Sequence, residues 1–162
     1  MAQVDYFLKF DGIKGESADA KHKDEIDIEA WSWGETNAAG HASGGGGGAG
    51  KVSMQDFHLV MKLNKASPKL MLACATGEHI KKAILTCRKA GKDQQEYLVV
   101  NMEDLLVSSY QTGGSGASDV VPIDQISLNF SKISVGYKEQ KPDGSLGGAV
   151  TVGYDLKQMK SV

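Results

Sequence analysis

Residues 44–63, GGGGGAGKVSMQDFHLVMKL, join a run of glycines to an apolar segment with the alternation of a β-strand. Apolar side chains occupy every second position on both sides of Gln55 and Asp56, but their parity changes there. The alternation predicts a half-buried strand, and the change of parity predicts a β-bulge near these two residues. Glycines have little preference for any regular structure, so residues 44–50 are expected to form an excursion between two strands.

The same glycines nearly match a phosphate-binding loop, because residues 45–51 fit the pattern G-x-x-x-x-G-K. Val52 stands where that motif requires the hydroxyl of serine or threonine. An alternating strand follows Val52, whereas a phosphate-binding loop opens a helix. A nucleotide-hydrolysing enzyme is therefore disfavoured.

Alternating segments recur along the whole chain and are separated by turn residues, and no helices alternate with them. A second change of parity falls between Phe130 and Ile133 and predicts a second bulge, as in sharply curved sheets. The pattern predicts a mostly β fold, namely a single closed antiparallel β-barrel of about eight strands. The expected strands are residues 6–10, 25–33, 52–63, 83–89, 96–102, 105–112, 126–137 and 150–156.

One segment has the signals of a helix instead of a strand. Ser67 and Pro68 suit the start of a helix, residues 70–75 are apolar throughout, and Gly77 suits its end. This short flanking α-helix lacks a polar face, so we expect it to be buried and to close the barrel.

Composition narrows the range of functions. The 162 residues suit one domain, and a net charge of −2 gives no basic surface for nucleic acid or an anionic membrane. The N-terminus lacks the basic and apolar regions of a signal peptide, so the protein is expected in the cytosol unless a dedicated machine exports it. Cys74 and Cys87 are expected to be buried thiols. No catalytic, cofactor-binding or metal-binding set is expected.

Trp31-Ser32-Trp33 is the most distinctive tripeptide. Strand alternation places both tryptophans on one face, where they can fill a core, and Ser32 on the other face. Ile26 and Ile28 share the parity of Ser32, so a further irregularity is predicted near Glu29 and Ala30.

Five segments resemble the haemolysin-coregulated protein (Hcp) family, the tube proteins of bacterial type VI secretion systems. The resemblance runs from about Asp5 to Leu156 and implies a fold like that of phage tail tube proteins. It implies hexameric rings that stack into a tube. It also implies three partners of that tube, namely a valine-glycine-repeat spike, a contractile sheath and a baseplate, and export of the protein without a signal peptide. The segments are FLKFDGIKGES (7–17), EIDIEAWSWG (25–34), residues 44–91, YLVVNMEDLLVSSYQTGGS (97–115) and ISLNFSKISVGYKEQKPDGS (126–145).

The resemblance also assigns candidate sites within a single tube domain, residues 1–162. It implies that Ser32 faces the ring lumen and contacts small effector proteins. It implies that an extended loop, about residues 35–51, reaches toward a neighbouring ring. The glycines of that loop are Gly44, Gly45, Gly46, Gly47, Gly48 and Gly50. A monomeric β-barrel that binds a small ligand stays open as an alternative, although the alternation predicts a filled core.

Overall fold

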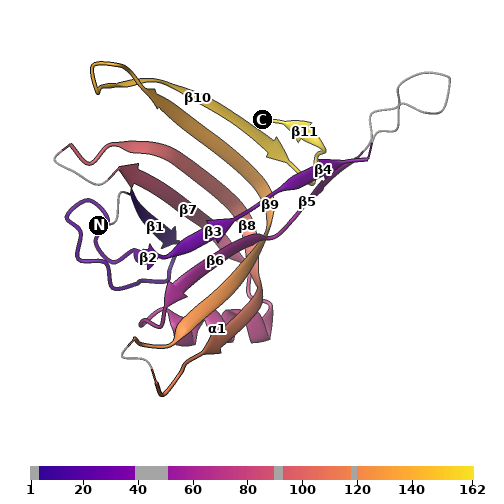
Figure 1. Cartoon of the computed structure of the whole chain (residues 1–162). Coiled ribbons are helices and arrows are strands. Elements are labelled where there is room, and N and C mark those ends of the chain that lie inside the picture. The colour runs from indigo at the N-terminus through magenta and orange to yellow at the C-terminus, as the bar shows by residue number, and fades with distance from the viewer. Residues whose placement is uncertain (1–3, 39–50, 90–92, 118–119) are drawn as a thin grey trace.

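The computed structural model describes residues 4–38, 51–89, 93–117 and 120–162. Within these ranges the chain forms one helix and eleven strands, which make a nine-stranded and a two-stranded sheet (Figure 1). Every strand pair is antiparallel. The elements are β1 Val4–Phe10, β2 Ile26–Ile28, β3 Ala30–Ser32, β4 Glu35–Asn37, β5 Val52–Met54, β6 Phe57–Lys62, α1 Ser67–Thr76, β7 Ile80–Lys89, β8 Glu96–Gly113, β9 Ile123–Gln140, β10 Leu146–Asp155 and β11 Lys160–Ser161.

The large sheet follows the order β11-β10-β9-β8-β7-β1-β2, and β6 joins it beside β9 and carries β3. Strands β8 and β9 are 18 residues long and pair with each other along most of their length. The other edge of β9 has two partners, because β6 pairs with residues 123–128 and β10 pairs with residues 132–140. The sheet therefore divides at β9 into two branches (Figure 1).

The mostly β fold with one helix is confirmed, whereas closure of the barrel stays a prediction. The strands also differ from those expected. Residues 96–102 and 105–112 belong to one strand, β8, and residues 25–33 contain two strands, β2 and β3. Asp104 explains the first difference, because its left-handed backbone (φ 48°) is accommodated inside β8 without ending the ladder.

Two of the three predicted irregularities are confirmed. Glu29 separates β2 from β3, and Gln55 with Asp56 separates β5 from β6. For the third, the change of parity is confirmed, because Phe130 and Ile133 are both buried. The bulge itself is wrong, since β9 runs without a break past Ser131 and has the same register with β8 on both sides of it. The register shift between these strands lies instead in β8, between Val107 and Ser109.

The core lies between the strands and contains side chains that are almost completely buried. Trp31 stacks on Phe57 at 5.6 Å and meets Tyr6 edge-on at 6.2 Å. Trp33 also stacks on Phe57, and its Nε1 donates a hydrogen bond to the backbone oxygen of Gln55 at 3.0 Å. Both tryptophans are half-buried and pack against the core, as expected from the alternation of residues 31–33. The largest core side chains are Leu8, Ile26, Phe57, Leu59, Met61, Leu70, Leu85, Met102, Leu105, Val107, Ile126 and Leu128.

Helix α1 ends as predicted at Gly77, whose φ of 69° is left-handed. Its N-terminus differs slightly, because Ser67 is the first helical residue and Ala66 is the N-cap. The expectation of a helix buried all around is wrong. Leu70 and Ala73 face the core, whereas Met71 and Leu72 are 50% and 57% exposed. The helix packs on the sheet at one end of the molecule, so only one side of it is covered (Figure 1).

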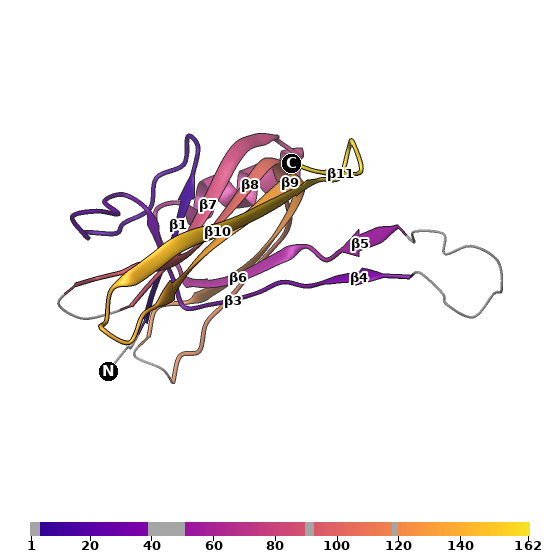
Figure 2. The same cartoon turned by 90° about the horizontal axis from the view of Figure 1, so that it is seen from above.

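Strands β4 and β5 form their own two-stranded sheet, which projects from the rest of the molecule (Figure 2). The expected strand after Lys51 is therefore confirmed, and no helix opens there as a phosphate-binding loop would require. The predicted glycine excursion, residues 44–50, falls within residues 39–50, which lie outside the described residues. In the part of the chain that the structure describes, no helix is long and apolar enough to cross a membrane.

Candidate functional site: a polar row on the outer sheet face

Three strands bring Ser32 into a row of polar side chains. Ser32 of β3 lies opposite His58 of β6, and His58 lies opposite Ser127 of β9. Strand alternation turns the neighbours Trp31 and Leu59 to the core face, so this row points away from the core. Ser109 of β8 continues the row, because it pairs with Ser127.

Hydrogen bonds hold much of this face in place. His58 Nδ1 and Ser127 Oγ are 2.8 Å apart, a hydrogen-bond distance. Beside them, Asp56 accepts a hydrogen bond from Ser108 Oγ at 2.6 Å and another from Asn129 Nδ2 at 2.9 Å. Ser32 is exposed at the end of the row, so its hydroxyl is available to a molecule that approaches the face.

The row combines a serine with a histidine, yet the arrangement is not that of a catalytic triad. Both oxygens of Asp56 are engaged with Ser108 and Asn129, so this carboxylate does not orient the imidazole as the third member of a triad would. Ser127 is almost fully buried, which leaves its hydroxyl little access to a substrate. Hydroxyl, imidazole and amide groups of this kind can donate and accept hydrogen bonds.

Ser32 was the only member of this row named from the sequence. His58 could have been found from its parity, because it alternates with Phe57 and Leu59 and must point outward with Ser32. The positions of Ser127 and Asn129 beside this row follow from the pairing of β6 with β9, and no local pattern in the sequence predicts that pairing.

A second cluster fixes residues 14–25 against strands β1, β7 and β8. The Arg88 guanidinium donates two hydrogen bonds to Asp19, at 3.0 and 2.7 Å, and a third to Asp5 at 3.1 Å. This guanidinium lowers the pKa of Asp19 far below its usual range, and the same pairing raises the pKa of Arg88. Arg88 also lies 4.7 Å over the Phe7 ring.

His22 belongs to this cluster and stacks on the Phe7 ring. Its ring lies 4.4 Å from the Phe7 ring at an interplanar angle of 7°. Its Nδ1 and Nε2 lie 2.9 Å from Glu25 and 2.7 Å from Glu96 respectively. The cluster therefore ties the segment between β1 and β2 to β1, β7 and β8, which is a structural role.

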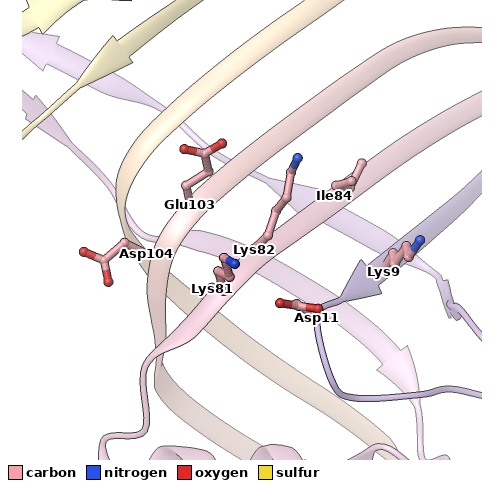
Figure 3. Close-up of a pocket in the computed structure, with 7 residues that line it drawn as sticks. All are labelled: Lys9, Asp11, Lys81, Lys82, Ile84, Glu103 and Asp104. Atoms are coloured by element: carbon pink, nitrogen blue, oxygen red, sulfur yellow. The ribbon is translucent and has the colours of Figure 1, made fainter.

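An open hollow of about 660 Å³ lies over β1, β7 and β8 (Figure 3). Its lining mixes both signs of charge, so it has no clear preference for an anion or a cation. The residues come from β1, the turn after it, β7 and β8: Lys9, Asp11, Lys81, Lys82, Ile84, Glu103 and Asp104. At its edge Asp104 accepts hydrogen bonds from Lys157, His79 and Ser131, which lower its pKa to about 2.

The two thiols differ from each other. Cys87 is buried, and burial raises its pKa to about 12, whereas Cys74 is only half-buried on α1. Among the described residues, no group of three or more His, Cys, Asp or Glu side chains could hold a metal ion.

Comparison with known proteins identifies the class of protein. The family model described as "Type VI secretion system effector, Hcp" matches residues 7–137. Protein hcp1 of Pseudomonas aeruginosa is 46% identical over 157 residues, which are 96% of each chain. The crystal structure of Hcp1 from Salmonella typhimurium is 35% identical, with a TM-score of 0.82 over 99% of this chain and 100% of that one. Another solved structure, that of a type six secretion system protein, is 29% identical, with a TM-score of 0.91 over 98% of this chain and 99% of that one.

These matches define a structural protein of the type VI secretion tube and not an enzyme. They confirm the resemblance noted in the sequence. The chain belongs to the Hcp family.

Proposed function

We propose that this chain forms hexameric rings which stack into the secretion tube, and that the outer face with Ser32 lines the ring lumen. The observation that supports this most strongly is the match to Hcp proteins over almost the whole length of the fold. In this arrangement residues 1–162 act as one tube domain.

The same proposal includes a closed barrel. β2 pairs with β1, β3 pairs with β6, and only Glu29 separates β2 from β3. The Glu29 amide donates a hydrogen bond to the backbone oxygen of Val60 at 2.8 Å, which carries the chain across the gap. Joined through Glu29, β2 and β3 would link the β1 end of the sheet to β6 and so close the circuit from β1 through β7, β8, β9 and β6, leaving β10 and β11 outside it.

In the lumen, the polar row would contact small effector proteins. Ser32 is exposed there, and most of its neighbours already satisfy one another, so the wall offers few strong attachment points. Weak, repeated contacts from six subunits suit cargo that must be held and then released.

The remaining partners belong to the same proposal. The β4–β5 hairpin would carry the glycine loop toward the neighbouring ring, and the tube would meet a valine-glycine-repeat spike, a contractile sheath and a baseplate. Assembly would take place in the cytoplasm, and the protein would leave without a signal peptide. The alternative of a monomeric ligand-binding barrel is not favoured, because the chain belongs to a tube family and side chains such as Phe57 and Met61 occupy its interior.

Electron microscopy and cargo capture test the proposal together. Negative-stain images of purified protein should show six-fold rings with an open centre. Ser32→Gln should leave the rings intact while reducing the small proteins that co-purify from secreting cells, because the longer side chain projects into the lumen. Ser161→Gln, the same change at an exposed serine of β11, should retain them. Unchanged cargo in Ser32→Gln rings would contradict the lumenal assignment, and compact monomers would contradict the ring.

A further inference from the structure

His22 has a carboxylate at each of its two ring nitrogens. Glu25 Oε2 lies 2.9 Å from Nδ1, and Glu96 Oε1 lies 2.7 Å from Nε2. Glu25 belongs to the same segment as His22, whereas Glu96 is the first residue of β8. His22 is only 6% exposed, so water cannot readily take the place of either carboxylate. The side chain therefore joins the segment to the sheet through two polar contacts.

Both contacts together require two protons on the ring. A neutral imidazole has one N–H donor, and its other nitrogen is an acceptor. In a neutral ring, one nitrogen lone pair would face a carboxylate oxygen at a distance of 2.7 or 2.9 Å, with no proton between them. The imidazolium donates a hydrogen bond to each carboxylate, and hydrogen bonds between ionised groups are stronger than those between neutral groups.

The other charged groups around this ring keep their charges near neutral pH. Arg88 of β7 donates hydrogen bonds to Asp19 and Asp5. Arginine is always protonated in proteins, and Arg88 holds the pKa of Asp19 well below its usual range. Lys138 of β9 lines a small hollow with Glu96, and lysine keeps its charge in the range where histidine titrates. The imidazole therefore supplies the change of charge near neutral pH.

The segment that His22 holds also covers an apolar side chain. Phe7 alternates with the core residue Leu8 and so points to the opposite face of β1, yet it is only 4% exposed. The His22 ring stacks on the Phe7 ring at 4.4 Å. Movement of His22 away from the sheet would therefore uncover Phe7.

We propose that His22 is a pH-sensitive switch, which holds residues 20–24 against β8 while its ring carries two protons and releases them when one proton is lost. Histidine changes its charge between about pH 5 and 8. The closed form binds the second proton more tightly than the open form, so the closed form is favoured at the lower end of this range and is lost as the pH rises. The inference concerns a single subunit and goes beyond the proposed ring.

Nuclear magnetic resonance reports the protons of His22 directly. In ¹⁵N spectra of the purified protein, both ring nitrogens should have the shift of a protonated nitrogen at about pH 7, where a free histidine is mostly neutral. One of them should move to the shift of an unprotonated nitrogen at higher pH. A single protonated nitrogen at about pH 7 would overturn the inference.

Trypsin measures the opening of the segment. Lys21 and Lys23 are exposed on either side of His22, and their cleavage requires the backbone there to leave the fold, so its rate follows the population of the open form. The rate is divided by that of a free peptide of residues 17–27 at the same pH. This ratio should rise about tenfold between about pH 6 and about pH 8.5, because one hydrogen bond to a charged group is lost. An unchanged ratio would contradict the switch.

Two variants separate protonation from packing. Glu96→Gln places an amide beside Nε2, and its N–H can donate to an unprotonated ring nitrogen, so the neutral ring keeps both contacts. The trypsin ratio of this variant should stay constant over the same range of pH. His22→Gln removes the titrating group, so its ratio should be high and equal at both ends of the range. His79→Gln is the matched control, because His79 is an exposed histidine beside a single carboxylate, Asp104. It should behave as wild type.

The outcomes also separate this inference from the proposed function. A dependence on pH that persists unchanged in Glu96→Gln or in His22→Gln would overturn the switch. If His22→Gln does not fold, the wild-type spectra and Glu96→Gln still decide. Six-fold rings of the wild-type protein would leave the proposed function standing in either case.

Discussion

Ser67 Oγ donates a hydrogen bond to Asp124 Oδ2 at 2.5 Å and so joins the first residue of α1 to the start of β9. Tyr110 of β8 donates to the same oxygen at 3.1 Å. Asp124 is fully buried, and this carboxylate connects three elements at the end of the molecule where the helix packs.

Replacing Asp124 should therefore loosen that end of the fold. Asp124→Ala leaves the hydroxyls of Ser67 and Tyr110 without their acceptor, and we expect it to lower the free energy of unfolding by about 2–4 kcal/mol. Asp124→Asn keeps one acceptor oxygen and should cost less. Urea denaturation measures both, with the exposed Asp93→Asn as control. Wild-type stability in Asp124→Ala would show that the carboxylate does not hold the helix.

Asp19 should make the fold sensitive to acid. Arg88 holds the pKa of Asp19 below its usual value of 3.8, so the folded protein keeps this carboxylate ionised where the unfolded chain begins to bind a proton. The ionised Asp19 contributes fully to the free energy of unfolding above pH 3.8. This contribution is lost as the pH falls below 3.8 toward the pKa of Asp19 in the folded protein. Asp19→Asn should be less stable at neutral pH and should lose less stability below about pH 4. Thermal midpoints of both proteins across this range measure how steeply stability falls with pH. If Asp19→Asn showed the same dependence on pH as wild type, the pairing of Asp19 with Arg88 would be contradicted.

Trp31 should contribute to stability from its half-buried position. The ring packs between Tyr6 and Phe57, so Trp31→Ala removes aromatic contacts and opens a gap at the core edge. We expect a loss near the lower end of the ~3–5 kcal/mol seen for buried aromatics. Trp31→Phe keeps part of the stacking and should recover part of the loss. A thermal midpoint unchanged in Trp31→Ala would place the ring outside the cooperative core.

Gly15 is required by close packing between two backbone segments. A Cβ at this position would lie 2.5 Å from the backbone oxygen of Glu25 and 2.7 Å from Cγ1 of Ile26. Gly15→Ala should force the 14–25 segment away from β2 and cost roughly 1–3 kcal/mol. Gly148→Ala, where a Cβ meets open space, should change stability by less than about 0.5 kcal/mol. Equal effects from the two variants would contradict this explanation.

Local patterns in the sequence were sufficient for most of the strands and for two of the breaks between them, whereas the short strands β4 and β11 were not predicted. The conflict in parity between Ile28 and Ser32 correctly placed an irregularity at Glu29, because each strand face must be wholly inward or outward. The continuity of β8 could not be predicted, since Glu103-Asp104 resembles a strand boundary until the left-handed backbone of Asp104 is seen.

The candidate site was only partly predictable, because it depends on distant pairing. Ser32, His58 and Ser127 come from three strands that are far apart in the sequence, and their common row follows from register. The contact between Arg88 and Asp19 spans 69 residues and leaves no mark on either local segment. The exposure of Met71 and Leu72 was missed for a similar reason, as composition does not show how much of a helix its neighbours cover.

The long pairing of β8 with β9 has a mechanical consequence. Its register extends from Leu98 opposite Tyr137 to Gly113 opposite Ile123. A force that slides these two strands past each other would load their hydrogen bonds in parallel, so many bonds would have to break at once. A subunit pulled along this ladder would therefore resist unravelling from one end.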